Sequence, residues 1–167
     1  ASATPSSVGA TVLANLLGAG FAGPVWPVNP RYATLAGQTC YPDIEHLPEA
    51  PELAVIATPA ATVPGLIDEL GQRGTRAAVV LSAGFGELGT AAGDELRQAM
   101  LDAARPRLLR IIGPNTVGLL NPGAGLNASF AHLSPRPGNI AFVTQSGALL
   151  TSVMDWAHSR QIGFSRL

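Results

Sequence analysis

The sequence predicts an α/β fold built on a parallel sheet, and two patterns carry this prediction. Short apolar runs recur along the chain, and each ends abruptly in small, polar or proline residues. Runs of this length without alternation are typical of strands buried on both faces of a parallel sheet. Between several of these runs lie segments with the helical spacing of apolar residues. Strands that alternate with helices in this way predict right-handed βαβ units.

Length and composition limit the class of protein. A chain of 167 residues has room for one ordinary domain, or for one domain and part of another. Only 13% of the residues are charged, against a usual share of about 25%. We therefore expect part of the surface to face another domain or subunit, and we expect a homo-oligomer.

All ten basic residues are arginines, which excludes lysine-based catalysis within the chain. The net charge of −1 and the lack of a basic cluster argue against nucleic acid as a partner.

The sequence predicts a cytoplasmic protein with no membrane partner. Cys40 is the single cysteine, so no disulfide can form within the chain, and this fits a reducing compartment. We expect no secretory leader. The long uncharged stretch Ile111–Pro135 contains several proline and asparagine residues. These would leave too many polar groups unmatched in lipid, so the stretch is not a membrane span.

The first predicted element is a helix that follows a small, polar opening. Its predicted buried face consists of Val8, Val12, Leu13, Leu16 and Leu17. A serine-rich turn that leads into a helix N-terminus is a place where phosphate binds. A Rossmann-type turn, however, needs a strand in front of it. Either the turn is an ordinary N-cap, or the first strand of the domain lies upstream of Ala1, and we expect the second.

Four strands are predicted for the sheet, each ending in a turn. They are Pro24–Asn29, Leu53–Thr58, Ala77–Leu81 and Leu109–Gly113, and we also expect a short turn of helix near Ile44–Leu47. If the four strands are parallel neighbours, their carboxyl ends meet at one crevice, where ligands bind in open α/β sheets.

Two helices are predicted between the later strands. Val63, Leu66, Ile67 and Leu70 form a regular apolar stripe. A second helix over Ala91–Ala104 is expected to bury Leu96, Met100 and Ala103, and Pro106 prevents its continuation.

The glycine-rich turn Ser82–Glu87 follows the third of these strands. It has little side-chain bulk apart from Phe85, so backbone N–H groups could approach a ligand closely. Taken alone, the turn fits a tight βα connection equally well. The similar ends of the other runs favour a ligand site.

The last part of the chain breaks the rhythm and then resumes it. Asn121–Pro137 is rich in Gly, Pro, Ser and Asn, and Ser134–Gly138 has the composition of a stiff linker. A strand over Asn139–Val143 then leads into another amphipathic helix, and a further strand begins near Gly163. The predicted buried residues of this helix are Leu150, Val153, Met154 and Ala157.

The histidines suggest no metal site. His46 has no second ligand at metal-binding spacing and is predicted to lie at the surface. His132 is predicted to be structural.

Six segments in order give the chain a family resemblance. They are SATPSSVGATVLANLL, PVWPVNPR, LAVIATPA, VVLSAGFGELG, IIGPNTVGLLNP and IAFVTQSGALLTSVMDWA. Over essentially its whole length the chain resembles the CoA-binding half of NDP-forming acyl-CoA synthetases, which include the α subunit of succinyl-CoA synthetase. The resemblance is strongest to bacterial acetate–CoA ligase-like proteins fused to an acetyltransferase of the GNAT type.

The resemblance implies a domain organisation. Residues 1–133 would form a Rossmann-like CoA-binding domain whose first strand lies upstream, and residues 134–138 a linker. Residues 139–167 would begin a second, flavodoxin-like α/β domain. The remaining synthetase domains or subunit would be partners.

The resemblance also implies binding residues. The first turn and the strand ends would bind CoA, and the turn after the strand at 139–143 would bind a phosphate delivered by a mobile phosphohistidine loop. The implied CoA-binding residues are Thr4, Ser6, Ser7, Asn29, Arg31, Thr58, Pro59, Ser82, Ala83, Gly84, Phe85 and Asn115, and the implied phosphate-binding residues are Thr144, Gln145, Ser146 and Gly147. For the phosphate turn, a plain N-cap by Ser146 is an equal alternative from the residues alone.

Two features depart from the family pattern. Gly113-Pro114-Asn115 is followed by Thr116 where the family has cysteine. The family's phosphorylated histidine lies beyond this chain, and His46, His132 and His158 do not match its motif. We therefore expect no catalytic residue within the chain and no ligase activity from it alone. The full-length protein would use ATP or ADP and Mg²⁺, which this chain would not bind.

Three functions remain open from the residues. The first is ligation of a carboxylic acid to CoA through an acyl phosphate and a phosphohistidine. The second is a CoA- or nucleotide-sensing body that regulates a fused protein acetyltransferase. The third, a dinucleotide-dependent dehydrogenase, is disfavoured because Asn29-Pro30-Arg31 stands where a ribose-binding carboxylate is expected.

Overall fold

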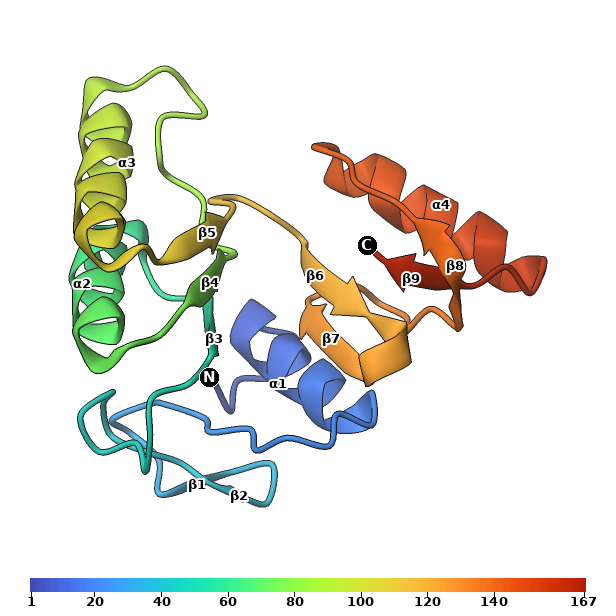
Figure 1. The fold of residues 1–167 in the computed structure, drawn as a ribbon, viewed down its shortest axis with the longest axis horizontal. Helices are drawn as coiled ribbons and strands as arrows, with labels where there is room; N and C mark the ends of the chain where they lie inside the picture. The colour runs from blue at the N-terminus through green and yellow to red at the C-terminus, as the bar shows by residue number, and fades with distance from the viewer. The chain divides into compact units, whose positions relative to one another are not determined.

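A computed structural model describes residues 1–167, which divide into two units (Figure 1). One unit comprises residues 41–116, and the other comprises residues 1–40 together with residues 117–167. The three-stranded parallel sheet of the first unit confirms the predicted α/β class. None of the helices has both the length and the apolar character needed to cross a membrane.

The unit of residues 41–116 is built on the predicted parallel strands. The strands β3 (Leu53–Ile56), β4 (Ala77–Val80) and β5 (Arg110–Ile112) lie in that order in the sheet. The helix α2 (Val63–Arg73), preceded by the 3₁₀ turn η1 (Ala60–Thr62), connects β3 to β4. The helix α3 (Ala91–Ala104) and the 3₁₀ turn η2 (Arg105–Arg107) connect β4 to β5. Both connections are therefore the predicted βαβ crossovers.

Burial explains why these segments adopt their structure. Ala78, Val79 and Val80 of β4 are completely buried, as expected for the central strand of a covered parallel sheet. Val63, Ile67 and Leu70 form the buried stripe of α2, which ends at Gly74 in the left-handed conformation.

The buried face of α3 differs from the predicted one. Met100 is buried as predicted, but Gly93 and Ala104 are the other buried residues. Leu96 and Ala103 are only half-buried. The helix packs against α2, and Gly93 in its first turn lies against Gly86 of the preceding loop. The buried face of α3 therefore includes small residues.

The unit of residues 1–40 and 117–167 has a different construction. The helix α1 (Val8–Gly18) packs against a hairpin of β6 (Gly118–Asn121) and β7 (Leu126–Ser129), whose turn contains η3 (Pro122–Ala124). The strands β8 (Pro137–Ala141) and β9 (Phe164–Arg166) form a parallel pair, and α4 (Gly147–Ser159) connects them. A small hairpin joins β1 (Thr34–Leu35) to β2 (Gln38–Thr39).

Two hydrophobic clusters hold this unit together. One lies under α1 and contains Leu13, Leu35 and Cys40. The other contains the buried residues of α4, the end of the chain and part of the hairpin: Leu120, Ala131, Leu150, Met154, Ala157, Phe164 and Leu167. Three of the four predicted core residues of α4 are therefore buried, and Val153 packs at the edge of the cluster.

Two predictions about these elements are wrong, and one element was not predicted. Pro24–Asn29 is extended but has only a single bridge residue, Val28, because Pro24 and Pro27 supply no N–H groups to a ladder. The short turn of helix predicted near Ile44–Leu47 is a single hydrogen-bonded turn, in which the Leu47 N–H donates to the Ile44 carbonyl at 3.2 Å. The start of α1 is more exposed than predicted, since Val8 is 43% accessible. No strand was predicted for the β6–β7 hairpin, because glycine, proline and asparagine in this segment are typical of a loop.

Candidate functional site

The carboxyl ends of the three parallel strands lie side by side, and hydrogen bonds tie their loops together. The Ser82 hydroxyl after β4 donates to the Thr58 carbonyl after β3, with a distance of 2.5 Å between the oxygens. The Asn115 N–H after β5 donates to the Ser82 carbonyl at 2.9 Å. The structure therefore brings together Thr58, Ser82 and Asn115, three of the predicted CoA-binding residues.

The backbone beside Asn115 is tightly constrained. Gly113 has a φ of +101°, and a Cβ on it would lie 2.4 Å from the Val80 carbonyl oxygen. Only glycine fits such a close approach without moving the central strand. Asn115 itself has a φ of +54°, and its side chain is exposed beside the glycine loop.

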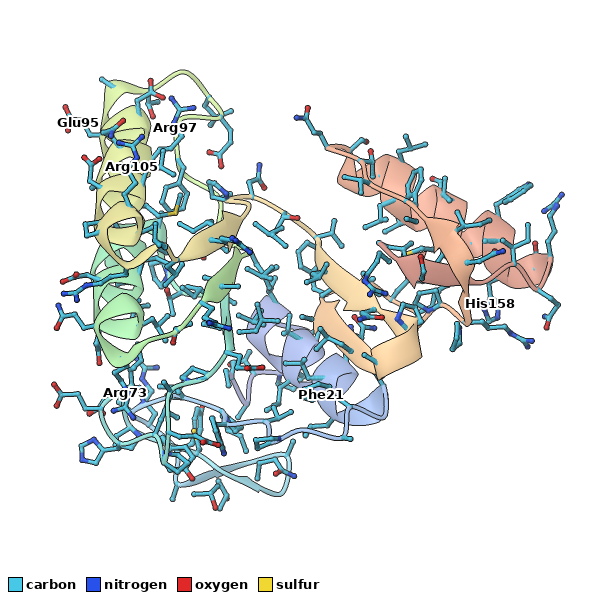
Figure 2. All side chains as sticks on the ribbon, in the orientation of Figure 1. Phe21, Arg73, Glu95, Arg97, Arg105 and His158 are labelled. Carbon is cyan, nitrogen blue, oxygen red and sulfur yellow. The ribbon has the colours of Figure 1, made fainter.

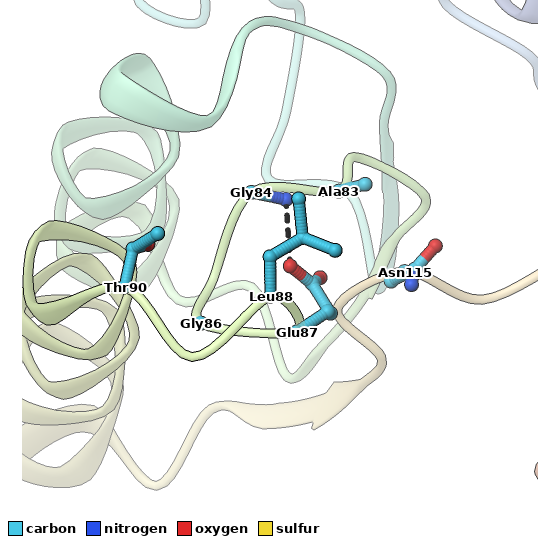
Figure 3. Close-up of a pocket in the computed structure, with 7 residues that line it drawn as sticks. All are labelled: Ala83, Gly84, Gly86, Glu87, Leu88, Thr90 and Asn115. Carbon is cyan, nitrogen blue, oxygen red and sulfur yellow. Dashed lines mark hydrogen bonds between the residues drawn. The ribbon is translucent and has the colours of Figure 1, made fainter.

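The glycine loop after β4 is folded around one carboxylate oxygen (Figure 3). The N–H groups of Gly84 and Phe85 both donate to Oε2 of Glu87, at 3.0 Å and 2.8 Å. Gly84 and Gly86 have positive φ values of 112° and 93°, which glycine adopts without strain. Phe85 is 2% exposed and anchors the loop in the core.

These hydrogen bonds alter the acidity of Glu87. The pKa of its carboxyl group is held below the usual value, chiefly by a hydrogen bond from its own backbone N–H. Desolvation opposes this effect and raises the pKa, while the N–H groups of Gly84 and Phe85 lower it further. The loop therefore binds a full negative charge at neutral pH.

A shallow cavity of about 270 Å³ opens at this loop. Figure 3 shows Leu88 and the Glu87 carboxylate between Thr90 and Asn115. The lining residues are Ala83, Gly84, Gly86, Glu87, Leu88, Thr90 and Asn115. Three predicted binding residues, Ala83, Gly84 and Asn115, therefore line one cavity, whereas Phe85 is buried behind it.

The turn before α1 holds a second group of predicted residues, within the other unit. The Ser7 side chain caps α1 by accepting from the Ala10 N–H at 3.3 Å, and it donates to the Thr4 carbonyl at 2.8 Å. Ser6 has a φ of +61° and an exposed side chain. The turn is therefore a capped helix N-terminus that carries several hydroxyl groups.

Asn29 links this turn to the predicted basic residue. Its side-chain amide donates to the Ala1 carbonyl at 2.8 Å, and its side-chain oxygen accepts from the Arg31 N–H at 2.9 Å. The N-terminal amine also donates to the Val28 carbonyl at 3.1 Å. The Arg31 side chain is exposed. The start of the chain and the Asn29–Arg31 segment thus lie together.

The predicted phosphate turn precedes α4. Ser146 caps the helix by accepting from the Leu149 N–H at 3.2 Å, and the Thr144 hydroxyl oxygen accepts from the Ser146 N–H at 3.0 Å. A Cβ on Gly147 would lie 2.7 Å from Cγ2 of Val117. The turn is therefore an N-cap, and close packing against Val117 is by itself enough to explain why residue 147 is a glycine.

The histidines lie outside these turns. His46 is exposed, as predicted, and pairs with Asp43 at 2.6 Å, while His132 pairs with Asp155 at 2.6 Å. The chain contains no group of three or more His, Cys, Asp or Glu side chains that could hold a metal ion.

The three arginines labelled in Figure 2, Arg73, Arg97 and Arg105, do not line the cavity. Arg73 donates to the carbonyls of Glu45 and Leu47 at 2.8 Å and 2.9 Å, which fixes the loop before β3. Arg97 and Arg105 form exposed ion pairs with acidic residues three positions earlier on α3. These pairs contribute little stability because water screens them.

Sequence patterns did not identify Glu87 as part of the site. The Glu87 carboxylate folds back onto the N–H groups of Gly84 and Phe85. Neither the spacing nor the type of the residues predicts this loop conformation. The sequence offered one indication: Glu87 lies within three residues of Gly84 and Gly86, and glycine readily adopts the positive φ that such a loop requires.

Both the sequence and the structure relate the chain to known proteins. Residues 1–122 match the family model described as CoA binding domain, and residues 137–167 match the succinyl-CoA ligase like flavodoxin domain. The chain is 38% identical, over its whole length, to acetate–CoA ligase [ADP-forming] I of Archaeoglobus fulgidus, and covers 24% of that protein. It is 36% identical to the α subunit of acetate–CoA ligase [ADP-forming] I of Pyrococcus furiosus, where 99% of this chain and 36% of the subunit are covered.

Comparison with solved structures shows the same relationship to acyl-CoA-forming enzymes. The dinucleotide forming acetyl-coenzyme A synthetase 1 of Candidatus Korarchaeum cryptofilum, in complex with phosphate and ADP, superposes with a TM-score of 0.93 at 40% identity. The match covers 99% of this chain and 35% of that chain. The chain thus spans about a quarter to a third of the length of these similar proteins.

Proposed function

Because the chain belongs to the CoA-binding domain family, we propose that it is the CoA-binding part of an NDP-forming acyl-CoA synthetase. The complete reaction would join a carboxylic acid, of the acetate class, to the CoA thiol. The observation that carries the proposal is the family match over residues 1–122, which includes the glycine loop, its cavity and the turn before α1. The ligase names of the similar proteins favour this enzyme over a regulatory body of an acetyltransferase.

The glycine loop suits the pantetheine arm of CoA. The arm carries amide groups and no charge, so it needs hydrogen-bonding partners along a surface with little side-chain bulk. Ala83, Gly84 and Asn115 line the cavity, and the hydrogen bond from Ser82 to the Thr58 carbonyl joins the two strand ends beside it. We assign these residues, with Pro59 and Phe85 as their supports, to the pantetheine path.

The turn before α1 suits the phosphates of CoA. A helix N-terminus attracts anions through its N–H groups and its dipole, and Thr4, Ser6 and Ser7 add hydroxyl groups. Arg31 adds a full positive charge on the segment that Asn29 ties to the start of the chain. We assign these five residues to the nucleotide end of CoA.

The turn Thr144–Gly147 suits a phosphoryl group brought from outside the chain. Its residues form the N-terminus of α4, a helix long enough to have a developed dipole. The nucleotide, Mg²⁺ and the phosphorylated histidine would belong to the remaining synthetase domains or subunit, and one similar protein is itself named as a subunit. We also propose that the protein is cytoplasmic and assembles as a homo-oligomer.

Substitution of Arg31 tests the CoA site. Hydrogen bonds to charged groups contribute about 1.5–3 kcal/mol, so Arg31→Ala should weaken CoA binding about ten- to a hundred-fold in a calorimetric titration. Arg136→Ala removes the same charge from an exposed residue outside the site and serves as the control. Equal CoA affinity in Arg31→Ala and the parent protein would remove Arg31 from the site.

A pair of substitutions separates the two roles of Gly147. In the complete protein, Gly147→Ala should reduce phosphoryl transfer while leaving CoA affinity nearly unchanged. Because the added methyl would meet Val117, the double variant Gly147→Ala with Val117→Ala relieves the packing conflict. If glycine is needed for the approach of an anion, the double variant stays impaired. Full recovery of transfer in the double variant would show that the glycine serves packing alone.

A further inference from the structure

Two backbone N–H groups of the Gly84–Glu87 segment are arranged to bind an anionic oxygen, and the Glu87 carboxylate already occupies this position. The two successive N–H groups of Gly84 and Phe85 converge on one oxygen of Glu87, at 3.0 Å and 2.8 Å. Successive backbone N–H groups around glycines with positive φ are the arrangement by which proteins bind phosphates and other anions. We refer to these two N–H groups as the cradle.

The cradle is rigid on one side and open on the other. Phe85 is buried, and a Cβ on Gly86 would meet Asp94 of α3 at 2.5 Å, so the backbone of the loop is held against that helix. Glu87 and Leu88 are exposed, and Leu88 is 92% accessible. The carboxylate can therefore swing into solvent without rearranging the core, while the N–H groups stay in place.

The cavity next to the cradle provides room for another anion. It is lined by Glu87 itself together with Thr90 and Asn115, whose side chains can donate hydrogen bonds. An anionic oxygen that took the place of the Glu87 carboxylate at this cavity would accept from the same two N–H groups. A ligand and Glu87 therefore cannot both be bound to the cradle.

We propose that the cradle is an oxyanion site for a phosphate- or carboxylate-bearing ligand, and that the Glu87 carboxylate is its internal competitor. The ligand displaces Glu87 on binding, and Glu87 keeps the N–H groups satisfied when the ligand is absent. The inference rests on the proposed function only in taking this cavity as part of the CoA site. The anionic oxygen could come from a CoA phosphate, which would then lie at the glycine loop and not at the turn before α1, or from a free oxyanion, and the experiment separates these sources.

Competition and structural support predict opposite results for Glu87→Ala. If Glu87 competes, its removal opens the cradle, and a site that is open one-tenth of the time would gain about ten-fold in apparent affinity. If Glu87 only holds the loop in shape, its removal loosens the loop and affinity falls. Glu95→Ala is the matched control, because it removes the same charge from an exposed residue of α3 that lines no part of the cavity (Figure 2).

The experiment titrates inorganic phosphate and, separately, CoA into the parent protein, Glu87→Ala and Glu95→Ala. We expect Glu87→Ala to bind at least one of the two about ten-fold more tightly, and Glu95→Ala to match the parent within about two-fold. If Glu87→Ala binds only CoA more tightly, the anion is a group of CoA. Tighter phosphate alone identifies a free oxyanion, and this result stands even if no variant binds CoA and the proposed function fails. Weaker binding of both ligands, or no change in either, overturns the inference.

An NMR titration of the parent protein gives a direct second measurement. Displacement removes the N–H donors from the Glu87 carboxylate, so its pKa should rise towards the usual value of about 4.3 when the cradle is filled. A Glu87 pKa that stays depressed at saturating phosphate and saturating CoA would show that the carboxylate never leaves.

Discussion

Replacement of Gly113 by alanine should destabilise the protein because two independent penalties act on one methyl group. The residue has a φ of +101°, which side chains rarely adopt and which costs about 1–3 kcal/mol. The new Cβ would also lie 2.4 Å from the carbonyl oxygen of Val80, a residue that is completely buried. Overpacking of this kind costs about 1–3 kcal/mol more. We therefore expect a loss of about 2–6 kcal/mol in the free energy of unfolding.

Urea unfolding followed by circular dichroism measures this loss. Gly65→Ala is the matched control, because Gly65 lies on α2 with nothing within 4 Å of its added Cβ. Alanine should stabilise that helix by up to about 1 kcal/mol. An unchanged free energy of unfolding in Gly113→Ala would refute the claim that the backbone around Gly113 leaves no room for a side chain.

Three further predictions concern the scaffold. Ile67→Ala, at a side chain with no exposed surface, should lower the free energy of unfolding by about 2–5 kcal/mol in urea, and a loss below about 1 kcal/mol would show that the core collapses around the cavity. Asn15→Ala removes an amide that donates to two backbone carbonyls after and within β7 at 2.9 Å each, and it should cost about 1–3 kcal/mol in the same assay. The hydrogen bond with Asp43 raises the pKa of His46 and lowers that of Asp43, so the pair stabilises the fold most fully between the usual carboxyl pKa and the usual histidine pKa. The contribution is lost as pH falls through the Asp43 pKa or rises through the His46 pKa. NMR titration should show a His46 pKa that returns to about 6.5 in Asp43→Asn, and no change there would contradict the pairing.

The strands and helices of the unit of residues 41–116 were predictable because local and tertiary signals agree there. β4 is an unbroken apolar run between turn residues, and burial on both faces selects that pattern. The helix α3 has its observed bounds, Ala91–Ala104, because Thr90 caps one end and Pro106 stops the other. Its buried face was less predictable, since the glycine that contacts the preceding loop carries no hydrophobic signal.

The β6–β7 hairpin shows what local patterns miss. Its buried residues include Asn127 and Ser129, which satisfy each other through a hydrogen bond of 2.5 Å between Ser129 Oγ and Asn127 Oδ1. A buried polar pair looks like a surface loop in the sequence, because its burial depends on partners that spacing does not reveal. The opposite error occurred at Pro24–Asn29, where an apolar run suggested a strand although its prolines cannot complete a ladder.

The candidate site was partly predictable for the same reason. Glycine-rich turns after parallel strands point to the carboxyl edge of the sheet, and Thr58, Ser82 and Asn115 are joined there by hydrogen bonds. The involvement of Glu87 depends on the return of its side chain to Gly84 and Phe85, which required the structure.

A calorimetric titration of the protein with CoA and, in parallel, with NAD tests the central proposal most directly. The exposed Arg31 favours CoA, because a dinucleotide site needs a carboxylate for the ribose where Asn29-Pro30-Arg31 stands. We predict saturable heat with CoA that Arg31→Ala weakens about ten- to a hundred-fold, and no saturable heat with NAD. Tight binding of NAD with no binding of CoA would contradict the assignment.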